Sequence, residues 1–173
     1  VLLPDYEGDR PEYLEFLECL QGHPKVQRVT EPWQTVEGQL KVAVYPAEDP
    51  EEIQVQEGEY DNDMSLVTSI TYGNQSFLLT GDIEDRRIGQ MLAEGINWKH
   101  DWIKMPHHGR YGKGLEDLLA AVAPKAAVIC CSEKHPAEDD TLMLLETYGI
   151  PVWDTKEQTV VTVCDGDRFT VEY

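Results

Sequence analysis

The sequence predicts a single α/β layered domain built around a mixed sheet. Two hairpin signals occur, at Gly73-Asn74 and at Asp165-Gly166-Asp167, each between runs of strand-forming residues. Between them, short apolar runs alternate with helical patterns, which is typical of strand–helix units. The 173 residues suit one domain, and an apolar share of 41% is enough for a core.

The first half of the chain is expected to contain one helix and several short strands. An apolar stripe with acids between its members predicts a helix over 11–20, and Gly22 and Pro24 end it. Alternating apolar and polar residues predict a half-buried strand over 40–45. Strands are also expected over 1–3 and 26–30, a connection over 31–38, and a long surface loop over 46–63.

The second half begins with the first hairpin, whose strands are expected over 65–72 and 75–79. Gly95 and Pro124 each close a helical pattern, and Pro106 stops a short apolar run. Helices are expected over 84–94, 115–122 and 139–148, strands over 101–105, 126–131, 151–153, 159–164 and 168–171, and loops over 107–114 and 132–138.

The formal net charge of −19 argues against tight nonspecific binding to nucleic acid or anionic lipid, because phosphate contacts need Lys and Arg. Most of the acids are interpreted as a solvated surface. No run of 18 apolar residues occurs, so no membrane segment is expected. The chain does not start with Met, and we expect it to be a fragment of a larger domain.

The four cysteines show no CxxC spacing, and Cys130 and Cys131 are neighbours in an apolar run. Adjacent strand residues point to opposite faces, so these two are not expected to pair. All four are interpreted as reduced and mostly buried thiols, which favours a cytoplasmic location.

Polar groups follow two apolar runs directly, and these groups form the candidate site. Asp82 comes after the run 77–79 and Thr80-Gly81, while His107 and His108 follow the run that ends at Pro106. Carboxyl ends of neighbouring strands open on one edge of an α/β sheet, so these side chains are expected to lie close together. Asp82 as a cap of the following helix is the alternative.

Three motifs occur in a characteristic order: Asn62-x-x-Ser65, Leu78-Leu79-Thr80-Gly81-Asp82 and Pro106-His107-His108-Gly109. In this combination the chain resembles the C-terminal part of metallo-β-lactamase-fold hydrolases, and within them the ComEC/Rec2-like branch. The resemblance covers about 61–162 and implies an αββα sandwich, of which this chain supplies the C-terminal portion with its mixed sheet flanked by helices.

The resemblance implies a site that binds divalent metal, usually two zinc ions. Asp82, His107 and His108 match the metal ligands, and His108 and His135 match catalytic positions. Which histidine of the adjacent pair binds metal, and which faces substrate or the proton path, stays open. Asn62 and Ser65 match a position that stabilises the sheet edge, and a basic group of Lys104, Arg110 and Lys113 is interpreted as a phosphate contact or ordinary surface charge.

The upstream motif of this superfamily, His-x-His-x-Asp-His, is absent, because no two of the five histidines are spaced two apart. Two functions therefore remain open. One is the C-terminal part of a metal-dependent hydrolase that acts on a phosphodiester or another ester by metal-activated water. The other is a catalytically inactive binding or structural module. In either case exposed apolar surface is expected to allow self-association.

Overall fold

The computed structural model describes residues 1–47 and 60–173, and its centre is a seven-stranded mixed sheet with the order β3-β4-β5-β6-β7-β8-β9. The strands are β3 Trp33–Glu37, β4 Leu40–Tyr45, β5 Val67–Tyr72, β6 Gln75–Leu79, β7 Trp102–Lys104, β8 Ala126–Ile129 and β9 Val152–Asp154. Neighbours from β3 to β6 are antiparallel, and neighbours from β6 to β9 are parallel. The predicted α/β class with a mixed sheet is confirmed.

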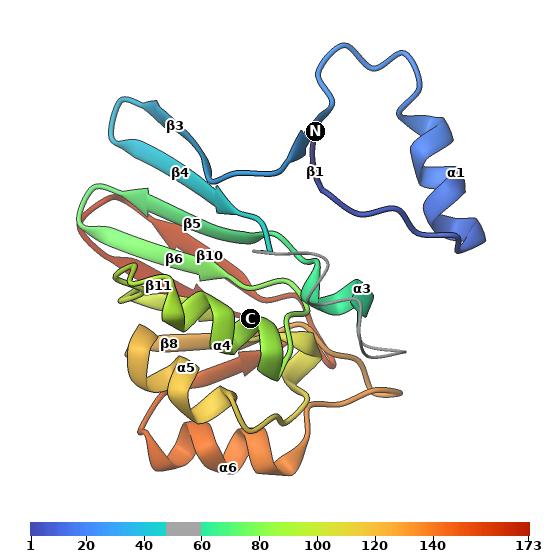
Figure 1. The fold of residues 1–173 in the computed structure, drawn as a ribbon. Coiled ribbons are helices and arrows are strands. Elements are labelled where there is room, and N and C mark those ends of the chain that lie inside the picture. Colours follow the sequence, from blue (N-terminus) through green and yellow to red (C-terminus); the bar gives the residue numbers. More distant parts are fainter. Residues whose placement is uncertain (48–59) are drawn as a thin grey trace.

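One face of this sheet is covered by helices and the other by a hairpin (Figure 1). The helices are α4 Asp85–Ala93, α5 Leu115–Val122 and α6 Asp139–Thr147, and the hairpin consists of β10 Val161–Cys164 and β11 Phe169–Glu172. Successive side chains of each strand point to opposite faces of the sheet. Leu78 pairs in register with Ile103, and both are fully buried in the helix-side core. Phe77 points to the other face, with its ring 5.8 Å from that of Phe169 in the hairpin.

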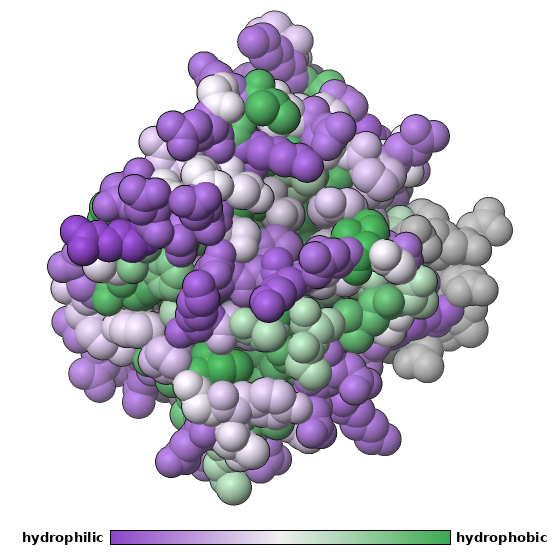
Figure 2. Space-filling view, turned by 90° about the vertical axis from the view of Figure 1, so that its left-hand side faces the viewer, coloured by the Kyte–Doolittle hydropathy of each residue, from purple (hydrophilic) through white to green (hydrophobic). Residues whose placement is uncertain are grey.

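The surface agrees with the acidic composition. Figure 2 shows hydrophilic residues over much of one face, with hydrophobic residues in separate areas among them. Among the described residues, no helix has the length and apolar character needed to cross a bilayer.

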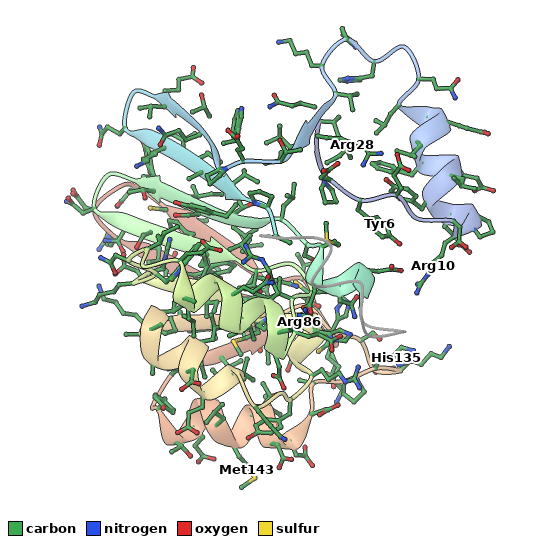
Figure 3. All side chains as sticks on the ribbon, viewed as in Figure 1. Tyr6, Arg10, Arg28, Arg86, His135 and Met143 are labelled. Atoms are coloured by element: carbon green, nitrogen blue, oxygen red, sulfur yellow. The ribbon has the colours of Figure 1, made fainter. Side chains whose placement is uncertain are left out.

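The N-terminal segment forms a small unit beside the sheet (Figure 1). Strands β1 Leu2–Pro4 and β2 Gln27–Val29 pair in parallel, with α1 Pro11–Cys19 between them. Arg28 Nη1 donates to the carbonyls of Pro4 and Tyr6, which ties the two strands to the loop before the helix (Figure 3). The predicted helix is present, but its apolar stripe buries no residue, and Leu14 is 48% exposed.

The expected connection over 31–38 is wrong, because Trp33–Glu37 form strand β3. Pro32 and Gly38 were interpreted as breakers, yet they only bound the strand. Gly38 adopts a left-handed φ of 59°, which lets the chain reverse tightly into β4. Trp33 and Val36 then pair with β4, as their β propensity allows.

The loop expected over 46–63 ends in a short helix, α3 Tyr60–Asp63, and residues 48–59 lie outside the described part. The remaining predicted elements are present, with boundaries that differ by one or two residues. The loop over 107–114 opens with a single 3₁₀ turn at His107–Gly109.

The four cysteines are free, but the expectation that most are buried is wrong. Cys19 and Cys130 are exposed, and Cys131 and Cys164 are half-buried. The strand β8 stops at Ile129, so Cys130 lies beyond the part of the run that the core covers.

Candidate active site

The candidate site lies where β6 and β7 end side by side. Leu79 pairs in parallel register with Lys104, so the segments after both strands emerge at one edge of the sheet. The side chain of Thr80 is fully buried and its hydroxyl donates to the carbonyl of Lys104 at 2.8 Å. The amide of His107 also donates to the carbonyl of Gly81, at 3.4 Å. These bonds hold the two turns together.

Asp82 and His108 converge across this edge. His108 Nε2 lies 3.3 Å from Asp82 Oδ2. The other ring nitrogen, Nδ1, lies 2.7 Å from the carbonyl oxygen of Cys130. A carbonyl only accepts, so Nδ1 carries a proton in this contact, and Nε2 is the ring nitrogen that faces the carboxylate. This is the arrangement in which metal-binding histidines are usually held.

Asp82 does not cap the following helix. Helix α4 begins after Glu84, and no side chain caps it. The Asp82 carboxylate instead faces Lys104, whose Nζ lies 3.2 Å from Oδ1 and donates to the carbonyl of Gly81 at 2.7 Å. Lys104 is therefore a half-buried partner of Asp82, with its side chain only 15% exposed, and not an ordinary surface charge.

His107 turns to a different carboxylate. Its Nδ1 lies 2.9 Å from Glu84 Oε1, although the two atoms are not aligned as a hydrogen bond. Glu84 accepts a hydrogen bond from Asn62 Nδ2 at 2.7 Å, and its amide donates to Asp63 Oδ1 at 2.7 Å. The two adjacent histidines are thus held by different partners: His108 meets Asp82, and His107 meets Glu84.

The backbone of the histidine pair is unusual. His107, His108 and Gly109 have consecutive left-handed φ values of 43°, 56° and 79°. Non-glycine residues rarely adopt this conformation, and strain of this kind clusters at functional sites. A Cβ on Gly109 would lie 2.9 Å from the side chains of Ala137 and Ile129, so the glycine lets the turn pack against the end of β8.

The loop after the histidines is held from two sides. Asp85 accepts from the amides of Lys113 at 3.1 Å and Gly114 at 2.9 Å. Glu138 Oε2 accepts from the amide of Tyr111 at 3.0 Å. These carboxylates fix the path of 110–114 beside the site.

A pocket of about 620 Å³ opens beside the histidine pair. It is lined by His107, His108, Arg110, Lys134, His135, Pro136, Ala137, Glu138 and Asp139. His135 lies on the exposed loop after β8 (Figure 3). The structure therefore brings all the candidate histidines to one pocket, with two basic side chains in an otherwise acidic chain. A second pocket of about 320 Å³ lies elsewhere, between the N-terminal unit and β4.

Asp82 Oδ2 and His108 Nε2 fit the ligand set of a divalent ion such as zinc. With bonds of about 2.1 Å, two ligand atoms of a tetrahedral site lie about 3.4 Å apart, close to the observed 3.3 Å. Within residues 1–47 and 60–173, no group of three or more His, Cys, Asp or Glu is placed to hold an ion. These two atoms do not by themselves complete a metal site within the described residues.

Shifted pKa values occur outside the pocket, at the start of β7. Burial lowers the pKa of His100, whose Nε2 lies 2.7 Å from Ser69 Oγ and whose Nδ1 lies 2.8 Å from the carbonyl of Trp98. Burial acts to raise the pKa of Asp101, but hydrogen bonds from Lys125 and Ser76 outweigh it and lower the pKa. These groups hold the far end of the sheet.

Sequence reasoning missed Glu84, and it assigned Asn62 and Ser65 to the sheet edge without identifying their partners. Glu84 follows Asp82 by two, with the buried Ile83 between them, and this alternation was the available signal. Asn62 was expected to stabilise the sheet edge, but it bonds to Glu84. Ser65 Oγ accepts from the amide of Asp82 at 3.0 Å, so both residues support the site.

Comparison with known proteins supports the resemblance that the motifs imply. No protein-family model matches the chain. ComE operon protein 3 of Bacillus subtilis (strain 168) is 30% identical over 103 residues, which is 58% of this chain and 13% of that protein. This chain thus spans a small part of its curated relative.

Among solved structures, a mutant of the CmlA beta-hydroxylase superposes with a TM-score of 0.52 and 12% identity, over 88% of this chain and 37% of that chain. A putative zinc-dependent hydrolase of the metallo-beta-lactamase superfamily from Thermotoga maritima aligns with a TM-score of 0.42 and 12% identity, over 69% of this chain and 59% of that chain.

The chain shares its fold with the CmlA beta-hydroxylase. In sequence it is similar to ComE operon protein 3, which supports its resemblance to metallo-β-lactamase-fold proteins of the ComEC/Rec2-like branch.

Proposed function

We propose that this chain supplies part of the active site of a metal-dependent hydrolase that cleaves a phosphodiester or another ester. The observation that carries the proposal is the approach of Asp82 Oδ2 and His108 Nε2 to 3.3 Å at the ends of two adjacent strands. The divalent ion, when bound, would activate a water molecule as the nucleophile.

In this proposal Asp82 and His108 bind the metal, and His107 takes the position that faces substrate or the proton path. The assignment of the two histidines rests on their different partners. Cys130 orients His108 toward Asp82, while Glu84 lies beside Nδ1 of His107 and leaves its Nε2 for the pocket. A carboxylate beside one ring nitrogen favours proton exchange at the other.

The pocket supports an anionic substrate. Arg110 and Lys134 bring positive charge to a chain whose net charge is −19. Arg and Lys side chains bind phosphate oxygens well, and His135 lies in the same lining, where it can contact substrate or a leaving group. Glu138 and Asp139, also in the lining, would disfavour a long polyanion, so a small phosphoester fits the pocket better.

The deciding experiment measures metal binding and hydrolysis together. Zn²⁺ and Mn²⁺ binding to the 173-residue chain is measured by calorimetry for the natural sequence, Asp82→Ala and His108→Ala. The longest natural protein that contains this chain is assayed with bis(p-nitrophenyl) phosphate, with and without Asp82→Ala. Both substitutions are expected to weaken metal binding at least tenfold, and Asp82→Ala to abolish metal-dependent hydrolysis.

Asp165→Ala and His23→Ala are matched controls, because they remove exposed groups of the same chemistry far from the site. Equal metal binding by the control and site variants would contradict the proposal, since the ions would then be held only by the acidic surface.

One observation favours the alternative of a non-catalytic module. Lys104 supplies a positive partner to one oxygen of Asp82. If Asp82→Ala leaves metal binding and hydrolysis unchanged while the fold is retained, the binding or structural module becomes the better description.

A further inference from the structure

We propose that the ammonium group of Lys104 stands where a two-ion site would place its second cation, so that this site takes one divalent ion. The inference rests on the proposed function, because it concerns the same carboxylate. It departs from the two-zinc site that the resemblance implies.

The two oxygens of Asp82 have different partners. Oδ2 faces His108 Nε2 at 3.3 Å, and Oδ1 faces Lys104 Nζ at 3.2 Å. A carboxylate that bridges two ions with one oxygen on each ion needs both oxygens free for metal. Here only Oδ2 is directed toward another ligand atom, and Oδ1 already has a positive partner.

Hydrogen bonds hold both the side chain and the backbone of Lys104 in this position. Its Nζ donates to the carbonyl of Gly81 at 2.7 Å, and its own carbonyl accepts from the buried hydroxyl of Thr80 at 2.8 Å. Lys104 is the last residue of β7 and pairs in register with Leu79 of β6. The side chain therefore projects from fixed backbone and is only 15% exposed.

The positive charge of Lys104 lets its ammonium group take the place of a second metal ion. A second dication at Oδ1 would lie within a few ångströms of a fixed ammonium group, in a partly buried site where solvent screens poorly. The single positive charge of Lys104 balances the carboxylate oxygen without the cost of holding another dication. A neighbouring Mn²⁺ or Zn²⁺ at Oδ2 is compatible with it, because His108 lies on the other side of the carboxylate.

The test counts ions in the folded chain. Native mass spectrometry and calorimetry with Mn²⁺ and Zn²⁺ are applied to the natural sequence, Lys104→Met and Lys104→Arg, each beside its Asp82→Asn counterpart to subtract surface binding. We expect one Asp82-dependent ion in the natural sequence and in Lys104→Arg. Lys104→Met keeps the stem without the charge, and it is expected to bind a second Asp82-dependent ion or to bind the first at least tenfold more tightly.

A crystal of the natural sequence soaked in Mn²⁺ gives a second count of the bound ions. This count does not depend on whether a variant folds. One anomalous peak at Asp82, with Lys104 still in contact with Oδ1, supports the inference. Two peaks that share Asp82, or a Lys104→Met chain that binds like the natural one, overturn it while leaving the proposed function intact. Ion binding that is insensitive to Asp82→Asn and His108→Ala, or no binding at all, overturns both.

Discussion

Gly81 and Ser65 are packed so closely that a Cβ on Gly81 would lie 2.5 Å from the Cβ of Ser65. Gly81 also has a left-handed φ of 62°, and Ser65 Oγ accepts the amide of the next residue, Asp82. The position of the candidate metal ligand thus depends on a glycine and a serine that carry no metal chemistry themselves.

Gly81→Ala is expected to destabilise the fold by about 2–4 kcal/mol, because it adds a left-handed alanine and a steric clash. Gly38→Ala is the matched control: its φ is 59°, but a Cβ there meets nothing within 4 Å, so a loss of about 1 kcal/mol is expected. Urea denaturation of the two variants measures the difference. Equal losses would show that backbone conformation alone decides the cost at Gly81.

The buried ion pair of Arg87 and Glu94 gives a second prediction. Arg87 Nη1 lies 2.8 Å from Glu94 Oε1, the two side chains are 0% and 6% exposed, and Arg87 Nη2 donates to the carbonyl of Pro46 at 2.6 Å. Glu94→Ala leaves a buried guanidinium without its partner, and we expect a loss of about 3–5 kcal/mol. Arg168→Ala breaks the exposed pair with Asp165 and should cost about 0–1 kcal/mol in the same denaturation experiment.

Because His100 is buried, we predict that the stability of the fold decreases at low pH. Burial lowers its folded-state pKa below 6.5, although the neighbouring Asp101 acts in the opposite direction. Above the unfolded pKa both states are neutral, and the stability of the fold is fully present. As the pH falls below about 6.5, the unfolded state binds the proton first and stability is lost, with a slope of at most about 1.4 kcal/mol per pH unit.

His100→Gln is the variant that measures this contribution. The free energy of unfolding of both chains is measured at several values between pH 7.5 and 5, and the difference between the two curves should narrow as the pH falls. A constant difference over that interval would contradict the assignment of the proton-sensitive group to His100.

Self-association gives a fourth prediction. Val161 and Val163 lie on the outward face of β10 and are 46% and 55% exposed, and β10 pairs only with β11 among the described strands. Sedimentation of the natural chain is expected to depend on concentration, and Val161→Thr with Val163→Thr is expected to weaken the association while keeping β propensity. A chain that stays monomeric at every concentration would contradict the prediction.

Local sequence signals identified most of the fold. The alternation in 40–45 and the Gly73-Asn74 turn predicted β4 and the following hairpin, because each pattern reports which side of a strand is buried. β3 was missed because Pro32 and Gly38 carried more weight than the strand-forming residues between them. Proline and glycine mark boundaries, and only pairing with β4 shows that a strand lies inside those boundaries.

The candidate site was also predicted only in part from the sequence. Motif order selected Asp82, His107 and His108, and their positions after consecutive apolar runs predicted a shared sheet edge. The partners of these residues could not be predicted from the sequence. Glu84 contacts His107, and Lys104 contacts Asp82, across the ends of different strands.

The sequence by itself therefore determined the class of fold, most of the order of the elements and the choice of candidate site residues, since these depend on periodicity and on residue type along the chain. The tertiary structure decided which histidine faces Asp82 and what balances the other oxygen of that carboxylate. Those relationships depend on the register between β6 and β7 and on the left-handed turn at His107–Gly109, which bring together groups that are far apart in the sequence.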